Sequence, residues 1–243
     1  HIQNSLDRIG VESLYIHQAK AIDLIRKDKN VIVSTPASSG KSLCYHLPVL
    51  ETILDDKSAR AIYLFPTKTL AQDQHNSLAE LINNSMRIRY AIFDGDTSSQ
   101  ERSVIRRNTQ LIISNPDMLH LGILPNHKNW YSFLKGLRYV VLDEAHVYRG
   151  VFGSHVANVI RRLRRLCLRF GSEPQFILCS ATIANPGDHA EHLTGLPFEV
   201  VDEDGSPYGG KDFVFWNPPV IDKDKGNRRS SNSEASIISM ELL

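Results

Sequence analysis

Seven short apolar runs recur along the chain and constrain its fold more than any other sequence feature. Each run is four to eight residues long, rich in β-branched residues and continuous rather than alternating. The runs occupy residues 30–35, 60–67, 87–93, 110–114, 137–143, 175–182 and 198–201. Continuous runs of this length are typical of strands that are covered on both faces, as in a parallel sheet.

Segments with helical periodicity separate most of these runs. The clearest is 154–170, where Val156, Val159, Ile160, Leu163, Leu166, Cys167 and Phe170 fall on one stripe. Gly171 follows as a stop signal. Strands that alternate with helices predict an α/β fold, namely a three-layer αβα arrangement around a mostly parallel central sheet.

The end of the chain differs in composition from the rest. From Gly205 onward Gly, Pro, Ser and charged residues dominate, which predicts a loop and interdomain linker over 205–233. A helical pattern restarts at 234–243 and stops without a cap. We therefore expect one large domain at 1–204 and the truncated start of a second domain at 234–243. A first residue other than Met agrees with a fragment of a longer protein.

Overall charge and cysteine content exclude some classes of protein. The net charge of +1 gives no indication of a nucleic-acid partner, so any such indication must come from local sites. Cys44, Cys167 and Cys179 are far apart among apolar residues, which favours free thiols in a reducing compartment. No apolar run reaches the roughly 18 residues that cross a membrane. We expect an intracellular protein.

The stretch "VSTPASSGKSL" at 33–43 ends in the tail of a phosphate-binding loop. The full pattern has a first glycine where this chain has Thr35. A buried-strand run precedes the loop and an apolar, helix-like run follows it. A strand, a tight turn and a helix N-terminus together present several backbone N–H groups to a triphosphate.

Each residue of this loop has a predicted role. Gly40 allows the backbone to approach the phosphates, and small Ser38 and Ser39 keep the loop open. Lys41 would bind the β- and γ-phosphates, and the Ser42 hydroxyl would ligate Mg²⁺. From the loop alone, the alternative is a strand–helix turn that contains Gly-Lys-Ser by chance.

The run "YVVLDEAH" ends in two carboxylates at the end of a predicted strand, where open α/β sheets bind their ligands. Asp143 is suited to hold Mg²⁺ through water, and Glu144 to orient the attacking water. In the next strand run, "SAT" places Ser180 and Thr182 where their hydroxyls could bond to the Asp143–Glu144 turn. Adjacent carboxylates also occur on plain surfaces, and Ser-Ala-Thr alone is a weak signal.

The ordered motifs "ASSGKS", "PTKTLAQDQ", "DGDT", "SNPDML", "DEAH" and "SAT" resemble the first of the two RecA-like domains of superfamily 2 helicases. This resemblance covers nearly the whole chain and implies ATP as the nucleotide. "LYIHQAKAI" at 14–22 resembles the adenine-reading motif of these proteins. Gln18 would then bond to the adenine edge, and Tyr15 would stack on the base or, alternatively, pack against a helix.

A narrower resemblance rests on "GKSLCYHLPVL", "FDGDT", "DEAHVYRGVFGSHVANVIRRLRRL" and "SATIANP". These segments look like the RecQ-related Hrq branch, shared by eukaryotic nuclear helicases and bacterial MrfA/YprA-type helicases. The branch implies 3′→5′ movement on DNA, a role in genome maintenance and DNA repair, and a nuclear or bacterial cytoplasmic location. It also implies a second RecA-like domain, which we expect to lie outside this chain. The isolated chain should therefore bind ATP weakly and not unwind DNA.

In the family, loops after two strands grip one DNA strand by its backbone. Thr67, Lys68 and Thr69 are the matching residues of the first loop, and Ser114 and Asn115 those of the second. None of these residue types is placed to read base edges, so binding would be independent of sequence. The alternative for each residue is an ordinary turn or helix cap.

Two features leave more than one interpretation. Arginines lie off the apolar stripe of 154–170, and no acidic residue occurs from Ala145 to Ser172. These arginines are Arg161, Arg162, Arg164, Arg165 and Arg169. They form either a solvated face or a contact with DNA, a neighbouring domain or a partner. His146 occupies the position that the family uses to couple hydrolysis to DNA, and the alternative is simple packing.

Two other functions compete with a DNA helicase motor. One is a DEAH-type RNA helicase domain, against which the Gln18 motif and "VYRGVFGSHVANVI" favour the DNA branch. The other is a nucleotide-binding scaffold without turnover, against which the intact Lys41, Asp143 and Glu144 argue for the parent protein.

Overall fold

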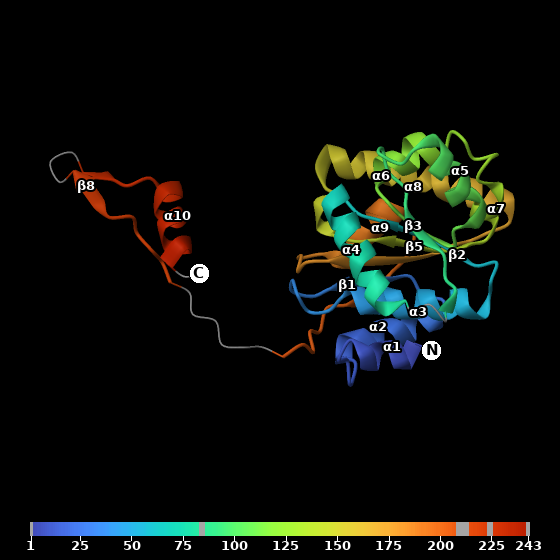
Figure 1. The fold of residues 1–243 in the computed structure, drawn as a ribbon, viewed down its shortest axis with the longest axis horizontal. Helices are drawn as coiled ribbons and strands as arrows, with labels where there is room; N and C mark the ends of the chain where they lie inside the picture. Colours follow the sequence, from blue (N-terminus) through green and yellow to red (C-terminus); the bar gives the residue numbers. More distant parts are fainter. Residues whose placement is uncertain (1, 83–85, 208–213, 223–225, 242–243) are drawn as a thin grey trace. The chain divides into compact units, whose positions relative to one another are not determined.

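A seven-stranded parallel sheet forms the centre of the protein (Figure 1). The computed structural model describes residues 2–82, 86–207, 214–222 and 226–241 and divides the chain into units at 1–206 and 207–243. The strands of the first unit are β1 (Val31–Ser34), β2 (Arg60–Leu64), β3 (Tyr90–Ile92), β4 (Leu111–Ser114), β5 (Leu137–Leu142), β6 (Gln175–Ser180) and β7 (Glu199–Val201). All seven apolar runs form strands, as predicted.

The strand order, β3-β4-β2-β5-β6-β1-β7, decides which motifs meet. Every neighbouring pair is parallel, so all seven strands end at the same edge of the sheet. β1, β6 and β5 are consecutive in the sheet although they are distant in the sequence. The loops that follow these strands therefore lie side by side at one edge, where α/β sheets bind ligands.

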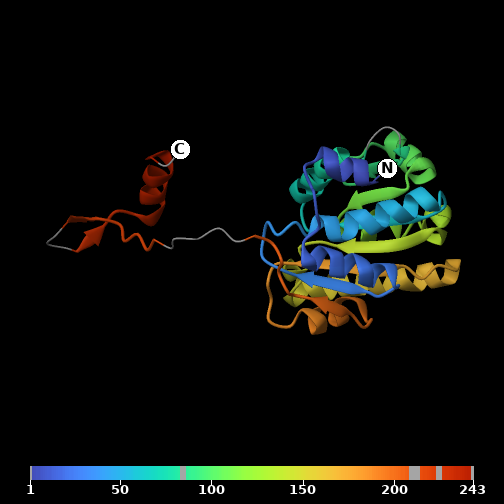
Figure 2. The same ribbon diagram turned by 90° about the horizontal axis from the view of Figure 1, so that it is seen from below.

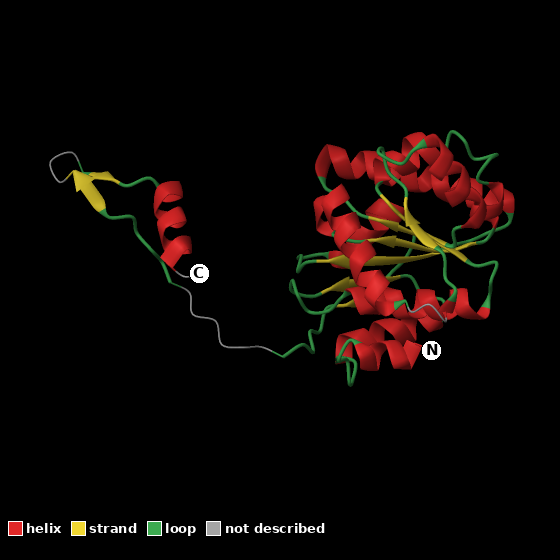
Figure 3. Cartoon of the chain, viewed as in Figure 1, coloured by secondary structure: helices red, strands yellow, loops and turns green. Residues whose placement is uncertain are grey.

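Helices cover both faces of the sheet, which confirms the predicted three-layer αβα fold (Figures 2 and 3). One face carries α1 (Ile2–Arg8), α2 (Ile16–Arg26), α3 (Ser42–Asp55) and α4 (Lys68–Leu81). The other carries α5 (Ser99–Asn108), α6 (Pro116–Met118), η2 (Leu119–Ile123), α7 (Tyr131–Lys135), α8 (Gly150–Phe170) and α9 (Pro186–Thr194). Val31 and Val33 of β1 enter the first core, and Ile32 enters the second. Because both faces of the sheet are buried at β1, its residues 31–33 are apolar whichever face they point to.

The long helix α8 begins earlier than its apolar stripe predicts, at Gly150. Gly153 lies in its first turn, where a Cβ would stand 2.4 Å from the carbonyl oxygen of Tyr148. Only glycine fits so close to that backbone. The helix ends as predicted at Gly171, which adopts the left-handed conformation with a φ of 81°.

The arginines of α8 include two that stabilise a neighbouring helix. Arg164 donates to the Thr194 carbonyl at 2.7 Å, and Arg161 donates to the His192 carbonyl at 3.4 Å. Both carbonyls lie in the last turn of α9, where cations complement the helix dipole. A third, Arg162, contacts the His120 ring at 2.6 Å. Part of the arginine row thus holds α8 against its neighbours.

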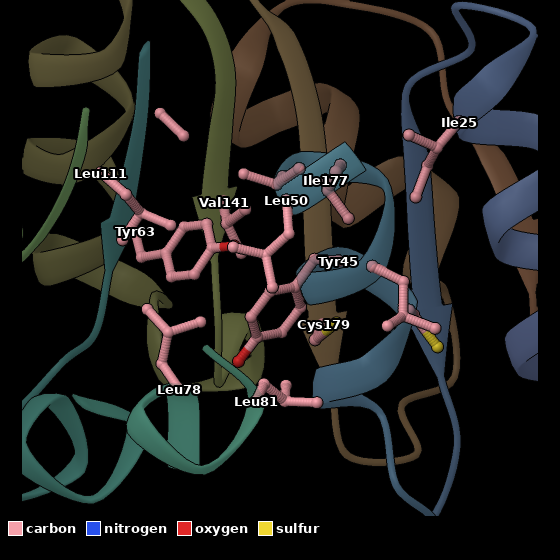
Figure 4. Packing of buried hydrophobic residues seen from close by; sticks show 14 of the residues in the cluster. Ile25, Tyr45, Leu50, Tyr63, Leu78, Leu81, Leu111, Val141, Ile177 and Cys179 are labelled. Atoms are coloured by element: carbon pink, nitrogen blue, oxygen red, sulfur yellow. The ribbon is translucent and has the colours of Figure 1, made fainter. Parts of the chain in front are cut away.

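A buried cluster of polar aromatic residues lies in the first core, where α3 packs against β2 (Figure 4). The rings of Tyr45 and Tyr63 pack edge to face with centroids 5.1 Å apart. His46 is fully buried beside them, with its Nδ1 3.4 Å from the Tyr63 hydroxyl. Burial lowers the pKa of His46 to about 3, so this imidazole stays neutral in the folded protein.

Acid should therefore destabilise this domain through His46. Below the ordinary pKa of 6.5 the His46 imidazole is protonated in the unfolded chain, but in the folded chain it stays neutral until the pH approaches 3. The free energy of unfolding therefore decreases as the pH falls from 6.5 to about 3. Between pH 7 and pH 5 the loss from this one group is about 2 kcal/mol. His46→Gln should remove most of this loss in urea unfolding of residues 1–243 at the two pH values. The exposed His155→Gln is the matched control, and an unchanged pH dependence in His46→Gln would contradict the assignment.

The second unit contains a short antiparallel pair and one helix. β8 (Val220–Asp222) pairs with β9 (Asn227–Arg228), and α10 (Ser231–Glu241) follows. Glu234 accepts hydrogen bonds from the Trp216 indole at 3.1 Å and from Arg229 at 2.9 Å. The segment predicted as loop and linker thus contains a strand pair, and parts of it and of 234–243 lie outside the described residues.

Among the residues that the structure describes, no helix has both the length and the apolar character needed to cross a membrane.

Candidate nucleotide and nucleic-acid site

The predicted phosphate loop connects the end of β1 to the start of α3. Its backbone turns through two left-handed residues, Ser38 with a φ of 63° and Gly40 with a φ of 77°. Thr35 fills the position of the missing glycine, is fully buried, and shares a 2.7 Å hydrogen bond with the Ser39 hydroxyl. Thr35 and Ser39 therefore brace the loop from within, and Gly40 supplies the close backbone turn.

Lys41 folds back over this loop. Its ammonium donates to the carbonyls of Thr35 at 3.0 Å and Pro36 at 2.6 Å. Ser42 opens α3 directly after it. A phosphate would offer the ammonium a charged acceptor in place of two neutral carbonyls, which is the stronger hydrogen bond. The lysine is thus held at the mouth of the loop, within reach of an anion that enters it.

Gln18 connects the adenine-reading motif to the phosphate loop. Its amide nitrogen donates to the Gly40 carbonyl at 2.8 Å, and its amide oxygen accepts from the Tyr15 N–H at 2.9 Å. Tyr15 precedes α2, is 36% exposed and stacks with the His17 ring at a centroid distance of 5.9 Å. The structure thus places Gln18 and, through its backbone, Tyr15 beside the Gly40 end of the phosphate loop.

Asp143 follows β5 and is almost fully buried. Its Oδ2 accepts from the Tyr45 hydroxyl at 2.9 Å, and its Oδ1 accepts from the Glu144 N–H at 2.8 Å. Burial raises the pKa of Asp143 to about 6, while these two hydrogen bonds act in the opposite direction. The two hydrogen bonds hold the carboxylate in one orientation.

Glu144 and His146 join the acidic turn to the end of β6. Glu144 adopts the left-handed conformation with a φ of 50°, which costs a non-glycine residue about 1–2 kcal/mol. Its Oε2 lies 3.2 Å from the His146 Nδ1 atom, which also accepts from the Ala181 N–H at 3.3 Å. Nδ1 accepts from Ala181 only when it carries no proton, and donates to Glu144 only when it does. The Nδ1 atom of His146 can therefore hydrogen-bond to either Glu144 or the Ala181 N–H, but not to both at once.

The hydroxyl of Ser180 takes a different partner from the one expected. It donates to the Ala181 carbonyl at 2.7 Å rather than to the Asp143–Glu144 turn. The same carbonyl accepts from Ser34 at the end of β1, at 3.3 Å. The described contact between "SAT" and the acidic turn runs through the Ala181 backbone, and Thr182 keeps its role only as a prediction.

The five predicted nucleic-acid residues fall into three groups. Lys68 and Thr69 are exposed at the start of α4, and Lys68 pairs with Asp96 at 2.6 Å. Thr67 and Asn115 cap the helices α4 and α6, accepting backbone N–H groups at 3.3 and 2.8 Å. The buried Ser114 hydroxyl donates to the Phe93 carbonyl, because a polar group at a strand end needs an internal partner, so the surface does not present it.

A family profile described as DEAD/DEAH box helicase matches residues 15–189. The chain belongs to this helicase family. The matched region begins at Tyr15 and ends at His189 in α9, so it contains the phosphate loop, the acidic turn and "SAT" together. Nucleotide binding is a property of this helicase domain.

Individual relatives are similar over nearly the whole chain. The "Uncharacterized ATP-dependent helicase YprA" of Bacillus subtilis is 49% identical over 100% of this chain and 32% of its own length. The "ATP-dependent helicase HRQ1" of Saccharomyces cerevisiae is 44% identical over 96% of this chain and 22% of its own length. The crystal structure of the helicase MrfA bound to DNA and AMPPNP matches 99% of this chain at a TM-score of 0.91 and 49% identity. The chain thus spans about a third or less of the relatives it matches.

Two histidines support the site although the sequence predicts no role for either: His189 lies outside the quoted motifs, and His17 lies inside "LYIHQAKAI". His189 of α9 contacts the Ala145 carbonyl through Nε2 at 2.7 Å and fixes the acidic turn from outside. His17 is fully buried, accepts from the Gly205 N–H at 3.3 Å and lies 3.6 Å from Asp204. Burial lowers the pKa of His17, against the opposing effect of Asp204. The adenine-reading segment is thereby packed against the chain that leaves β7.

Proposed function

We propose that this chain is the first motor domain of an ATP-dependent DNA helicase that acts in genome maintenance and DNA repair. The observation that carries the proposal is the meeting of the Lys41 loop with the Asp143–Glu144 turn at one sheet edge, in a chain of the helicase family. These residues supply a cation for the phosphates and the carboxylates that phosphoryl transfer to water uses. The relatives named ATP-dependent helicases support the same activity for the parent protein.

The residues present fit Mg²⁺ as well as ATP. Mg²⁺ prefers hard oxygen ligands, and the Asp143 carboxylate and the Ser42 hydroxyl are of this kind. Tyr45 lies one turn along α3 from Ser42 and contacts Asp143, so these two candidate ligands share a neighbour. When bound, the ion would neutralise charge on the β- and γ-phosphates.

Each of the site residues then has one role in ATP hydrolysis. Lys41 exchanges its two carbonyl acceptors for phosphate oxygens, and Gln18 and Tyr15 orient the adenine. Glu144 orients and polarises the attacking water. His146 lies between Glu144 and the Ala181 N–H and so connects the acidic turn to the residue that follows β6.

The nucleic-acid partner proposed here is single-stranded DNA, gripped independently of sequence. Exposed Lys68 and Thr69 and the cap residues Thr67 and Asn115 offer charge and polar groups suited to a phosphate backbone. The MrfA structures bound to DNA support DNA as this partner. The same proposal includes a second RecA-like domain, 3′→5′ polarity and a nuclear location, all of which rest on family resemblance. It also includes domain limits between residues 204 and 205 and between residues 233 and 234.

Unwinding of matched duplexes by the full-length protein tests this function. Two substrates with the same sequence and the same 3′ single-stranded tail, one of DNA and one of RNA, should be compared with ATP·Mg²⁺. We expect the DNA duplex to be unwound at least about tenfold faster than the RNA duplex, since DNA is the proposed track. Preferential RNA unwinding would support the DEAH-type RNA helicase instead, and binding of ATP without unwinding of either would support a scaffold.

A further inference from the structure

The Tyr45 hydroxyl connects the acidic turn to a helix that no nucleotide motif includes. Tyr45 is fully buried, and its hydroxyl lies 2.9 Å from Asp143 Oδ2 and 3.0 Å from Gln74 Oε1. The Ser42 hydroxyl is a further hydrogen-bonding neighbour of this phenol. One side chain thus touches the Asp143 carboxylate, the first residue of α3 and the body of α4.

The number of available protons fixes which group donates in the Tyr45–Asp143 hydrogen bond. A phenol has a single proton, and an ionised carboxylate can only accept, so Tyr45 donates to Asp143. Gln74 must then present a donor to the phenol oxygen, which a half-turn of its amide supplies. The arrangement that satisfies all three groups runs from the Gln74 N–H to the Tyr45 oxygen and from the Tyr45 O–H to Asp143.

Gln74 lies on the helix that begins with the proposed DNA contacts. α4 starts at Lys68 and is capped by Thr67, so Gln74 is about two turns into the same rigid element. Gln74 also lies beside the buried His46 ring and raises its pKa against the larger effect of burial. Because this region is buried and closely packed, a shift of α4 must be taken up by the Gln74–Tyr45–Asp143 contacts.

We propose that Tyr45 and Gln74 are positioning residues that set the orientation of the Asp143 carboxylate according to the position of the DNA-contacting helix α4. This inference rests on the proposed function, because it names a regulation of the same site. DNA bound at the start of α4 would bias the carboxylate toward its metal-holding orientation through two hydrogen bonds.

Tyr45→Phe in the full-length protein tests the inference, since it removes the hydroxyl and keeps the ring. Residues that orient a metal ligand typically change metal affinity about 10- to 100-fold. We expect the Mg²⁺ concentration for half-maximal binding of a fluorescent ATP analogue, and likewise for half-maximal ATPase, to rise about tenfold, and the stimulation by single-stranded DNA to fall at least about threefold. The KM for ATP at saturating Mg²⁺ should change less than about twofold. Gln74→Leu should lower DNA stimulation to a similar extent with a smaller change in Mg²⁺ requirement.

Tyr63→Phe is the matched control. Tyr63 is equally buried in the same cluster, but its hydroxyl contacts His46 rather than Asp143. It should leave both the Mg²⁺ requirement and the DNA stimulation at wild-type values. Wild-type behaviour of Tyr45→Phe, or equal shifts in Tyr63→Phe, would overturn the inference, and Gln74→Leu decides it if Tyr45→Phe loses its thermal unfolding transition. Failure of the proposed function is distinct, because the wild-type protein itself would then show no DNA-stimulated ATPase.

Discussion

Lys41→Ala in the full-length protein is expected to abolish unwinding and to lower ATP hydrolysis about a hundredfold or more. The ammonium is the one cation held at the mouth of the phosphate loop by contacts that the structure describes, at 3.0 and 2.6 Å from two loop carbonyls. Removing a preorganised charge from a phosphoryl-transfer site costs about two to three orders of magnitude in rate. Steady-state ATPase and duplex unwinding measure this loss.

The same substitution should leave the fold intact. Lys41 lies at the sheet edge, and its two hydrogen bonds go to carbonyls of its own loop rather than to the hydrophobic core. Lys57→Ala is the matched control, since Lys57 is an exposed lysine in the turn before β2, at the opposite edge of the sheet. Circular dichroism and thermal unfolding should be similar for both variants. Wild-type unwinding by Lys41→Ala would rule out the site assignment.

Residues 1–243 alone are expected to bind ATP·Mg²⁺ weakly and to hydrolyse it at least about a thousandfold more slowly than the full-length protein with DNA. The resemblance to superfamily 2 helicases implies an arginine finger from the second RecA-like domain, and such a finger contributes about three to five orders of magnitude in rate. The loop, the adenine contacts and the acidic turn are all within unit 1, so binding should survive. Titration with a fluorescent ATP analogue measures binding, and phosphate release measures turnover.

Single-stranded DNA should not rescue the isolated chain, because DNA contacts cannot supply the missing charge. The appropriate control is the same chain with Lys41→Ala, which should lose the residual analogue binding. DNA-stimulated turnover near the full-length rate in residues 1–243 would contradict the division of the site between two domains.

The strands could be predicted from the sequence because both faces of the sheet are covered. Three successive residues of β1, Val31, Ile32 and Val33, are fully buried, two against one helical layer and one against the other. The continuous run of apolar residues therefore indicates a strand that is buried on both faces. The strands β8 and β9 have three and two residues and lie in a polar segment. Strands this short show no hydrophobic periodicity from which they could be predicted.

The parts of the site that follow from spacing could be predicted, and the parts that follow from tertiary neighbours could not. Gly40 and Lys41 lie in the loop between β1 and α3, Asp143 follows β5 directly, and the shared sheet edge brings the two loops together. The Gln74–Tyr45 contact and the support from His189 depend on which helices pack together, which residue spacing does not encode. Ser114 shows the converse, since a polar residue at a strand end can turn inward to satisfy a carbonyl.

The ATPase rate of the full-length protein, measured without nucleic acid, with single-stranded DNA and with single-stranded RNA of the same sequence, tests the central claim most directly. A DNA helicase motor whose Asp143 site responds to DNA should hydrolyse ATP at least about tenfold faster with DNA, irrespective of DNA sequence, and gain little from RNA. Equal rates under all three conditions, or stimulation by RNA alone, would contradict it.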